Sequence, residues 1–209
     1  TLPSSNIPQC SDDTDAWGIT LDEFDEFQSH EISFDERDIF YYGVMNIQTY
    51  EEEQASSQSC KGPAGLAFLN RPFHANAKLS GIGYRKEGRW IRTAAHEIGH
   101  NHGRPHTANT DEFNDSCREP TGVDTDYPYE KGRTFKMGYD PIKRRLLSGY
   151  SHHDIMSYCE RKWISDYTYQ KINEFQREMA LNFNVPSNGA TAAPLANTEG
   201  TVFRFYESY

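Results

Sequence analysis

The sequence predicts a mixed α/β fold on three observations. Short runs of β-branched and aromatic residues, which are typical of strands, lie in the first half of the chain. Segments whose apolar residues recur at helical spacing lie before and after those runs. The length of 209 residues is enough for one domain with a sizeable core.

The predicted elements follow one another along the chain. The first 15 residues are polar and contain proline, which predicts an extended lead-in. Five elements come next: an amphipathic helix over 21–34, strands over 38–47, 65–69 and 79–84, and a helix over 89–102. The segment 107–150 is rich in Asp, Gly, Pro and Tyr and lacks periodicity, which predicts irregular structure. Ser165 then caps a helix over 166–182.

We expect residues 1–185 to form one domain, with an upper half over 1–103 and a lower half over 104–185. From 186 to 200 the composition turns to Ser, Asn, Gly, Ala, Thr and Pro, which is typical of a flexible linker. The segment 201–209 alternates like a strand. It is predicted to be a tail of this domain or the start of a further one.

Charge and hydropathy exclude several classes of partner. The net charge of −10 and the isoelectric point near 5.2 argue against nucleic acid and anionic membrane surfaces. No run approaches the roughly 18 apolar residues of a membrane span. We therefore expect a soluble monomer without a membrane span.

The most informative stretch runs from His96 to His106 and reads H-E-x-x-H-x-x-G-x-x-H. On a helix, His96 and His100 share one face and can hold one metal ion together. Gly103 can adopt the left-handed conformation that ends a helix, which lets His106 approach the same ion. Glu97 stands beside the first ligand, where it can take a proton from water. Three neutral imidazoles with a fourth position open to water predict a catalytic Zn²⁺ site.

A second motif, Asp154-Ile155-Met156-Ser157-Tyr158, follows downstream. Together with the histidine motif it resembles the Met turn of the metzincin clan of zinc endopeptidases. The resemblance implies that Met156 forms an apolar floor under the three imidazoles. It also implies that Tyr158 binds the zinc ion or the substrate oxyanion, as in the astacin-like and serralysin-like branches.

The subfamily stays open, because Thr107 departs from the residues that the known branches carry after the third histidine. The segments Tyr158-Cys159 and 163–169 are most similar to large secreted bacterial metzincins, including mucin-cleaving ones.

The resemblance implies a metzincin-like catalytic domain over 1–185, with a twisted, mostly parallel sheet and backing helices above the cleft. The lower half would be irregular and end in a C-terminal helix. An antiparallel edge strand would face the cleft, and an extended substrate would add to it through backbone hydrogen bonds. This strand would consist of Gly65, Leu66, Ala67, Phe68 and Leu69. The alternative is that these residues form an interior strand.

Four cysteines without a Cys-x-x-Cys pair predict two disulfides in a secreted protein. Of the three connectivities that four cysteines allow, we favour Cys10–Cys60 and Cys117–Cys159, each within one half. The second would tie the loop after the zinc helix to the Met turn. The alternative is four reduced thiols in a cytosolic protein.

Two further sets of residues carry weaker predictions. The carboxylates of the irregular segment are candidate ligands for Ca²⁺, although they lack the spacing of a helix-loop-helix calcium loop. They are Asp111, Asp115, Asp124 and Asp126. His102 lies two residues beyond His100, so it is expected to point away from the metal, toward solvent or a second layer around the site.

The ligand set predicts zinc-dependent hydrolysis with Glu97 as general base. The metzincin resemblance implies that the protein is a secreted endopeptidase that hydrolyses extended protein or glycoprotein substrates. Two alternatives remain. One is a catalytically inactive metzincin-like module that binds glycoprotein. The other is a zinc hydrolase that acts on other amides on the same scaffold.

Overall fold

The structure is a computed structural model that describes residues 14–31, 39–45, 63–70, 78–84, 90–107, 117 and 120–183. Within these ranges it is a mixed α/β fold, as predicted. The upper half contains α1 (Thr14–Glu31), β1 (Tyr41–Met45), β2 (Gly65–Ala67), β3 (Ser80–Tyr84) and α3 (Trp90–Asn101). The lower half contains η2 (Glu130–Gly132), β4 (Gly138–Asp140), β5 (Arg145–Leu147), β6 (His153–Asp154), β7 (Lys162–Trp163) and α4 (Asp166–Phe183).

Helix α1 begins seven residues before the predicted helix and shortens the predicted extended lead-in. The physical reason is its first buried turn. Trp17 and Leu21 are four residues apart, so they lie on one face of the helix. They are 1% and 3% exposed and pack in one cluster with Met45 and Ile82 of the sheet.

The upper half contains a sheet with the strand order β1-β3-β2. Strand β1 runs parallel to β3, with Tyr41 opposite Ser80. Strand β2 runs antiparallel to β3, with Leu66 opposite Ile82. Among the described strands, β2 therefore forms an antiparallel edge. It is shorter than the predicted 65–69 because pairing ends at Ala67, although the Phe68 amide still donates to the Ser80 carbonyl at 3.5 Å.

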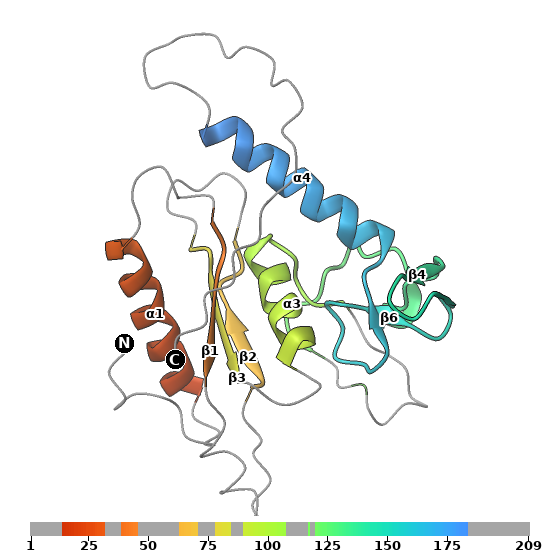
Figure 1. Cartoon of the computed structure of the whole chain (residues 1–209), viewed down its shortest axis with the longest axis horizontal. Helices are drawn as coiled ribbons and strands as arrows, with labels where there is room; N and C mark the ends of the chain where they lie inside the picture. Colours follow the sequence, from red (N-terminus) through yellow and green to blue (C-terminus); the bar gives the residue numbers. More distant parts are fainter. Residues whose placement is uncertain are drawn as a thin grey trace, which may run out of the picture.

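The sheet lies between α1 and α3 (Figure 1). Leu66 and Ile82 pack toward α1. On the other face, beside Glu97 of α3, the paired strands β2 and β3 carry the small residues Gly65, Ala67 and Gly81. A Cβ atom on Gly81 would lie 3.3 Å from the Glu97 Cβ, and one on Gly65 would lie 2.7 Å from the Glu97 Oε1. The absence of side chains at these positions lets α3 approach the sheet and places Glu97 beside β2.

The lower half is built from short elements between 120 and 165. Strands β4 and β5 form an antiparallel pair, with Tyr139 opposite Leu146, so the predicted irregular segment 107–150 contains a hairpin. Sequence patterns miss it because each strand has three residues and both side chains of this pair are exposed. Strands β6 and β7 pair in parallel, with His153 opposite Lys162.

Helix α4 closes the described chain, and its start was predicted correctly. The Ser165 hydroxyl accepts a hydrogen bond from the Thr168 amide at 3.1 Å, which is an N-cap. Phe175 and Met179 on this helix are buried against Leu79, which precedes β3. Of the helices in the described part of the chain, none combines the length and apolar character that a membrane crossing requires. The predicted linker and tail over 186–209 lie outside the described residues.

Candidate metal centre

Helix α3 carries the first two histidines of the motif, and its end places the third. Gly103 has φ 71°, the left-handed conformation predicted for it. The Gly103 amide donates to the His100 carbonyl at 2.8 Å, and the Arg104 amide donates to the Gly99 carbonyl at 3.0 Å. These two bonds form a Schellman motif, which ends the helix and turns the chain back. A Cβ atom at Gly103 would also lie 2.8 Å from the Asn70 carbonyl oxygen, so this position requires glycine.

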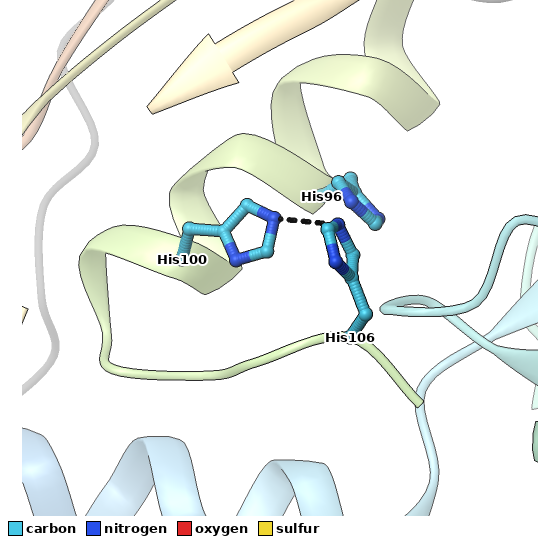
Figure 2. A group of neighbouring side chains, drawn as sticks. All are labelled: His96, His100 and His106. Atoms are coloured by element: carbon cyan, nitrogen blue, oxygen red, sulfur yellow. Dashed lines mark hydrogen bonds between the residues drawn. The ribbon is translucent and has the colours of Figure 1, made fainter. Parts of the chain in front are cut away.

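The turn brings His106 to the other two histidines, as predicted. One ring nitrogen from each of His96, His100 and His106 lies within 4.8 Å of the others, which is a group able to hold a metal ion. Figure 2 shows His96 and His100 projecting from the helix toward His106, which comes from the chain beyond its end. The Nε2 atoms of His100 and His106 are 3.1 Å apart.

The hydrogen bonds of the three rings fix which nitrogen is free to bind a metal. Each Nδ1 lies within hydrogen-bond distance of a backbone carbonyl: His96 with Ile155 at 2.8 Å, His100 with Arg104 at 2.7 Å, and His106 with Thr121 at 3.0 Å. A carbonyl only accepts, so each neutral ring donates from Nδ1 and keeps a lone pair on Nε2. The three backbone carbonyls therefore select the same tautomer in all three histidines.

This tautomer gives the contact between His100 and His106 a specific meaning. Two Nε2 lone pairs that face each other repel unless one ring is protonated or a cation lies between them. Protonation is opposed, because burial, with His106 as the next cause, lowers the pKa of His100 to about 4. Two ligands of one tetrahedral zinc ion at about 2.1 Å would be about 3.4 Å apart, close to the observed distance. The residues present therefore fit a divalent metal.

The other two ligands are also held neutral. Burial lowers the pKa of His96 well below its usual value, and the charges of Lys162 and His100 lower it further. Burial also lowers the pKa of His106, while its bond to the Thr121 carbonyl opposes the shift. Neutral imidazole is the form that binds a metal, so the site requires little proton release from its histidines at neutral pH.

Glu97 is buried between α3 and the sheet, 6% exposed, beside the first ligand. Its carboxylate lies against Gly65, where β2 begins. Burial raises the pKa of Glu97 to about 8, and the Lys162 ammonium opposes this shift. The carboxyl group can therefore both take and release a proton near neutral pH.

The predicted Met turn packs against α3 between His96 and His100. Met156 is fully buried, and its Sδ lies so close to Gly99 that a side chain there would collide with it. Asp154 shapes the turn by accepting hydrogen bonds from the Met156 amide at 2.8 Å and the Ser165 amide at 2.9 Å. The turn also returns to the motif, because the Thr107 amide donates to the Met156 carbonyl at 3.2 Å.

Tyr158 lies against two of the three histidines and is partly exposed to solvent. It is 42% exposed, and its ring centroid lies 4.7 Å from that of His106 and 5.8 Å from that of His96. Burial, followed by the charge of Glu97, raises the pKa of Tyr158, so its hydroxyl remains a hydrogen-bond donor at neutral pH.

Two residues of the site carry no sequence motif. The first is Lys162, whose charge affects the pKa of Glu97 and of all three histidines; burial lowers its own pKa to about 8. The second is Asn101, fully buried, whose amide donates to the Phe68 carbonyl at 3.1 Å and the Ser80 carbonyl at 2.9 Å. Asn101 thereby fixes the end of α3 to the sheet. The sequence signal that could have identified Asn101 is its position in the helix next to His100.

His102 points away from the triad, as predicted, and of the two surroundings predicted for it, solvent is the wrong one. It is 4% exposed and stacks on Phe40 with ring centroids 4.0 Å apart. Its other neighbours lie on α4: Phe175, at 5.6 Å between ring centroids, and Gln176, at 3.2 Å from its Nε2. The C-terminal helix therefore packs against His102, just beyond the end of α3.

The structure joins Cys117 and Cys159 by a disulfide, the pair that we favoured for the lower half. With His153 these sulfurs form a second group of potential metal ligands, but here they are bonded to each other. Cys10 and Cys60 lie outside the described residues.

The two predicted calcium ligands that the structure describes belong to no group of three or more His, Cys, Asp or Glu side chains close enough to share an ion. The groups that could hold a metal include neither Asp124 nor Asp126, and Asp124 is bonded to Arg104 and Tyr167 instead. The other two predicted calcium ligands, Asp111 and Asp115, lie outside the described residues.

The chain matches no protein-family model, no curated protein and no solved structure. The functional argument therefore depends on the residues and geometry of this site.

Proposed function

We propose that the chain is a zinc-dependent endopeptidase of the metzincin type. The observation that carries this proposal is the convergence of three neutral imidazoles, each held by a backbone carbonyl so that its Nε2 lone pair points to one place. Glu97 follows His96 in the helix, with its carboxylate against Gly65, and the buried Met156 packs against Gly99, which precedes His100. Three histidines with an open position and an adjacent carboxylate are the donor set of a hydrolytic zinc site.

A bound zinc ion would polarise the scissile carbonyl, lower the pKa of the attacking water and favour the ionised form of Glu97. The Glu97 carboxylate takes a proton from that water and later delivers it to the leaving amine. Its pKa of about 8 in the metal-free protein suits both roles, because neither the acid nor the base form is strongly disfavoured near neutral pH.

Tyr158 and β2 supply the contacts to substrate. The Tyr158 hydroxyl donates a hydrogen bond to the developing oxyanion. The edge of β2 pairs with an extended peptide, which brings its scissile bond past Glu97. This geometry favours protein or glycoprotein substrates over small amides. We further propose that the enzyme is secreted and monomeric; the Cys117–Cys159 disulfide is compatible with an oxidising compartment.

The test combines metal content with cleavage. Purified chain would be analysed for bound zinc and then incubated with a panel of proteins and mucin-type glycoproteins, with and without a zinc chelator. Fragment ends would be read by mass spectrometry. We expect one zinc ion per chain and cuts that chelation abolishes and added zinc restores.

Two results would contradict the proposal in different ways. Bound zinc without any cleavage would favour a glycoprotein-binding module, which retention of intact glycoprotein on immobilised chain would reveal. Cleavage of small amides with intact proteins left uncut would instead favour a non-peptidase zinc hydrolase.

A further inference from the structure

Arg104 lies between the second and third histidines and is buried, although its charge would normally keep it at the surface. Its guanidinium forms an ion pair with the Asp124 carboxylate, and the two side chains are only 10% and 11% exposed. The Tyr167 hydroxyl donates to the same carboxylate at 3.2 Å, and the Tyr167 ring lies 5.3 Å from the guanidinium carbon. A buried pair of this kind is costly unless its partners are fixed, so it holds the chain in one arrangement.

The Asp124 backbone connects this pair to the third histidine. The Asp124 amide donates to the His106 carbonyl at 2.7 Å. Three residues earlier, the Thr121 carbonyl accepts from the His106 Nδ1 at 3.0 Å, and Val123 forms a bridge with His106. The segment 121–124 therefore holds both the backbone and the ring of His106.

Arg104 also holds the second histidine, by a different atom. Its backbone carbonyl accepts from the His100 Nδ1 at 2.7 Å. Arg104 thus acts on both histidines. Its backbone carbonyl orients His100, and its side chain holds the segment that orients His106. His106 needs this support, because it lies beyond the helix end and no helical hydrogen bond fixes its position.

We propose that Arg104 and Asp124 form a positioning pair that fixes His106 as third ligand and so sets the metal affinity of the site. The proposal rests on the metal centre proposed above and extends it to residues that do not touch the ion. The carboxylate acts through His106, by anchoring the segment whose carbonyl and amide hold this histidine.

The experiment measures zinc affinity of the metal-free full chain by competition with a chromophoric chelator. Asp124→Asn keeps the shape of the side chain but removes the ion pair. We expect it to weaken zinc binding about 10- to 100-fold, the range seen when a group that orients a ligand is removed. The matched control is Asp126→Asn, which removes the same charge from an exposed residue two positions away and should leave affinity unchanged.

A second comparison separates positioning from simple charge attraction. In the background of His106→Ala, zinc would be held by His96 and His100 only. If Asp124 acts through His106, Asp124→Asn should cause no further loss of affinity in this background. Arg104→Met and Asp124→Asn should likewise be non-additive, since each removes the same pair.

Three results would overturn the proposal. The first is unchanged zinc affinity in Asp124→Asn, and the second is an equal loss in the presence and absence of His106, which would indicate long-range electrostatics. In either case wild-type zinc binding would still support the proposed function. The third, a wild-type chain that binds no zinc, would overturn both. If Asp124→Asn does not fold, Tyr167→Phe removes one bond to the same carboxylate and should show a smaller loss that also depends on His106.

Discussion

The two halves of the molecule are held together by different kinds of interaction. In the upper half, an apolar cluster of Trp17, Leu21, Met45 and Ile82 joins α1 to the sheet. Between 104 and 165, neither described apolar cluster contributes a residue, and the buried side chains are mainly polar: Arg104, Thr107, Thr134, His153, Asp154, Ser157 and Ser165, beside Leu147, Met156 and Cys159. Apolar clusters therefore stabilise the upper half and the packing of α4 on it, whereas specific hydrogen bonds define the rest of the lower half.

The candidate metal centre lies where the two halves meet. His96, Glu97 and His100 come from α3 of the upper half, and His106 and Tyr158 come from the lower half. A scaffold of apolar contacts tolerates small shifts, whereas a network of buried hydrogen bonds has few alternatives. We infer that the upper half sets stability and that the lower half sets the geometry of the metal ligands.

The largest effect should come from the upper half's reacting group. Glu97→Gln keeps the size of the side chain against Gly65 but removes the proton acceptor. We expect kcat to fall about 10⁴-fold, the upper end of what general acid–base catalysis contributes, with one zinc ion still bound per chain. Steady-state kinetics and metal analysis of the same sample would check this. Retention of wild-type kcat would remove Glu97 from the mechanism.

The next effect concerns stability alone. Ile82 is 1% exposed in the apolar cluster, so Ile82→Ala should lower the free energy of unfolding by about 2 to 5 kcal/mol through lost burial and a cavity. Urea unfolding in the presence of chelator would measure it. The zinc affinity of the folded variant should equal that of wild type. A parallel loss of zinc affinity would mean that the upper half also controls ligand geometry.

Tyr158→Phe tests the reacting group of the lower half. Loss of the hydroxyl should lower kcat about 100-fold, in the range for one oxyanion donor, while zinc affinity stays unchanged. The half-exposed ring would keep its contacts with His96 and His106, so the fold is not at risk. Steady-state kinetics would determine kcat and KM separately and show that the loss is in kcat. An equal loss of zinc affinity would instead identify Tyr158 as a metal ligand.

Asp154→Asn is the lower-half counterpart of Ile82→Ala. An amide in place of one carboxylate oxygen cannot accept both the Met156 and Ser165 amides, so one buried donor loses its partner. We expect a cost of about 1 to 3 kcal/mol in unfolding free energy. Zinc affinity should also fall, because the turn supplies the Ile155 carbonyl that orients His96. The same chelator competition would measure it, and unchanged affinity would remove the contrast between the halves.

The same contrast explains how much the sequence could predict. Helical spacing is local, so the pairing of His96 with His100 and the turn at Gly103 followed from the motif alone. The strands of the upper half were found because apolar and β-branched residues mark them. In the same half, however, the surroundings of His102 could not be predicted. Its direction follows from helical spacing, but its burial under α4 depends on residues about seventy positions away.

Less of the lower half could be predicted from the sequence, because its contacts join distant residues and follow no periodic pattern. Nothing local in the sequence links Arg104 to Asp124, or Lys162 to Glu97. The hairpin of β4 and β5 was missed for a related reason, since its strands are short and exposed. Asp154 belongs to the Met-turn motif, but the sequence does not show that it holds the turn, because this depends on its contact with the distant Ser165.

The smallest predicted effect is a pH dependence of the stability of the metal-free protein, in which Glu97 and the three histidines act in opposite directions. The pKa of Glu97 is raised from 4.5 to about 8, so between these values the folded state binds a proton that the unfolded state has released. Stability therefore falls as pH rises through that range. The pKa values of His96, His100 and His106 are lowered from 6.5, so stability falls as pH drops below 6.5.

The stability contributed by the site should therefore be greatest near pH 6.5. Glu97→Gln should remove the decline above that pH and make the loss of stability below it steeper. Between pH 6.5 and about 7.5 we expect the wild type to lose about 1 kcal/mol relative to this variant. Lys162, whose pKa is lowered to about 8, contributes mainly above this range, where it raises stability with pH. Urea unfolding at several pH values with chelator present would measure the difference. Parallel curves for the two proteins would mean that Glu97 is already ionised in the folded, metal-free state, and hence that its environment is more polar than its burial beside β2 implies.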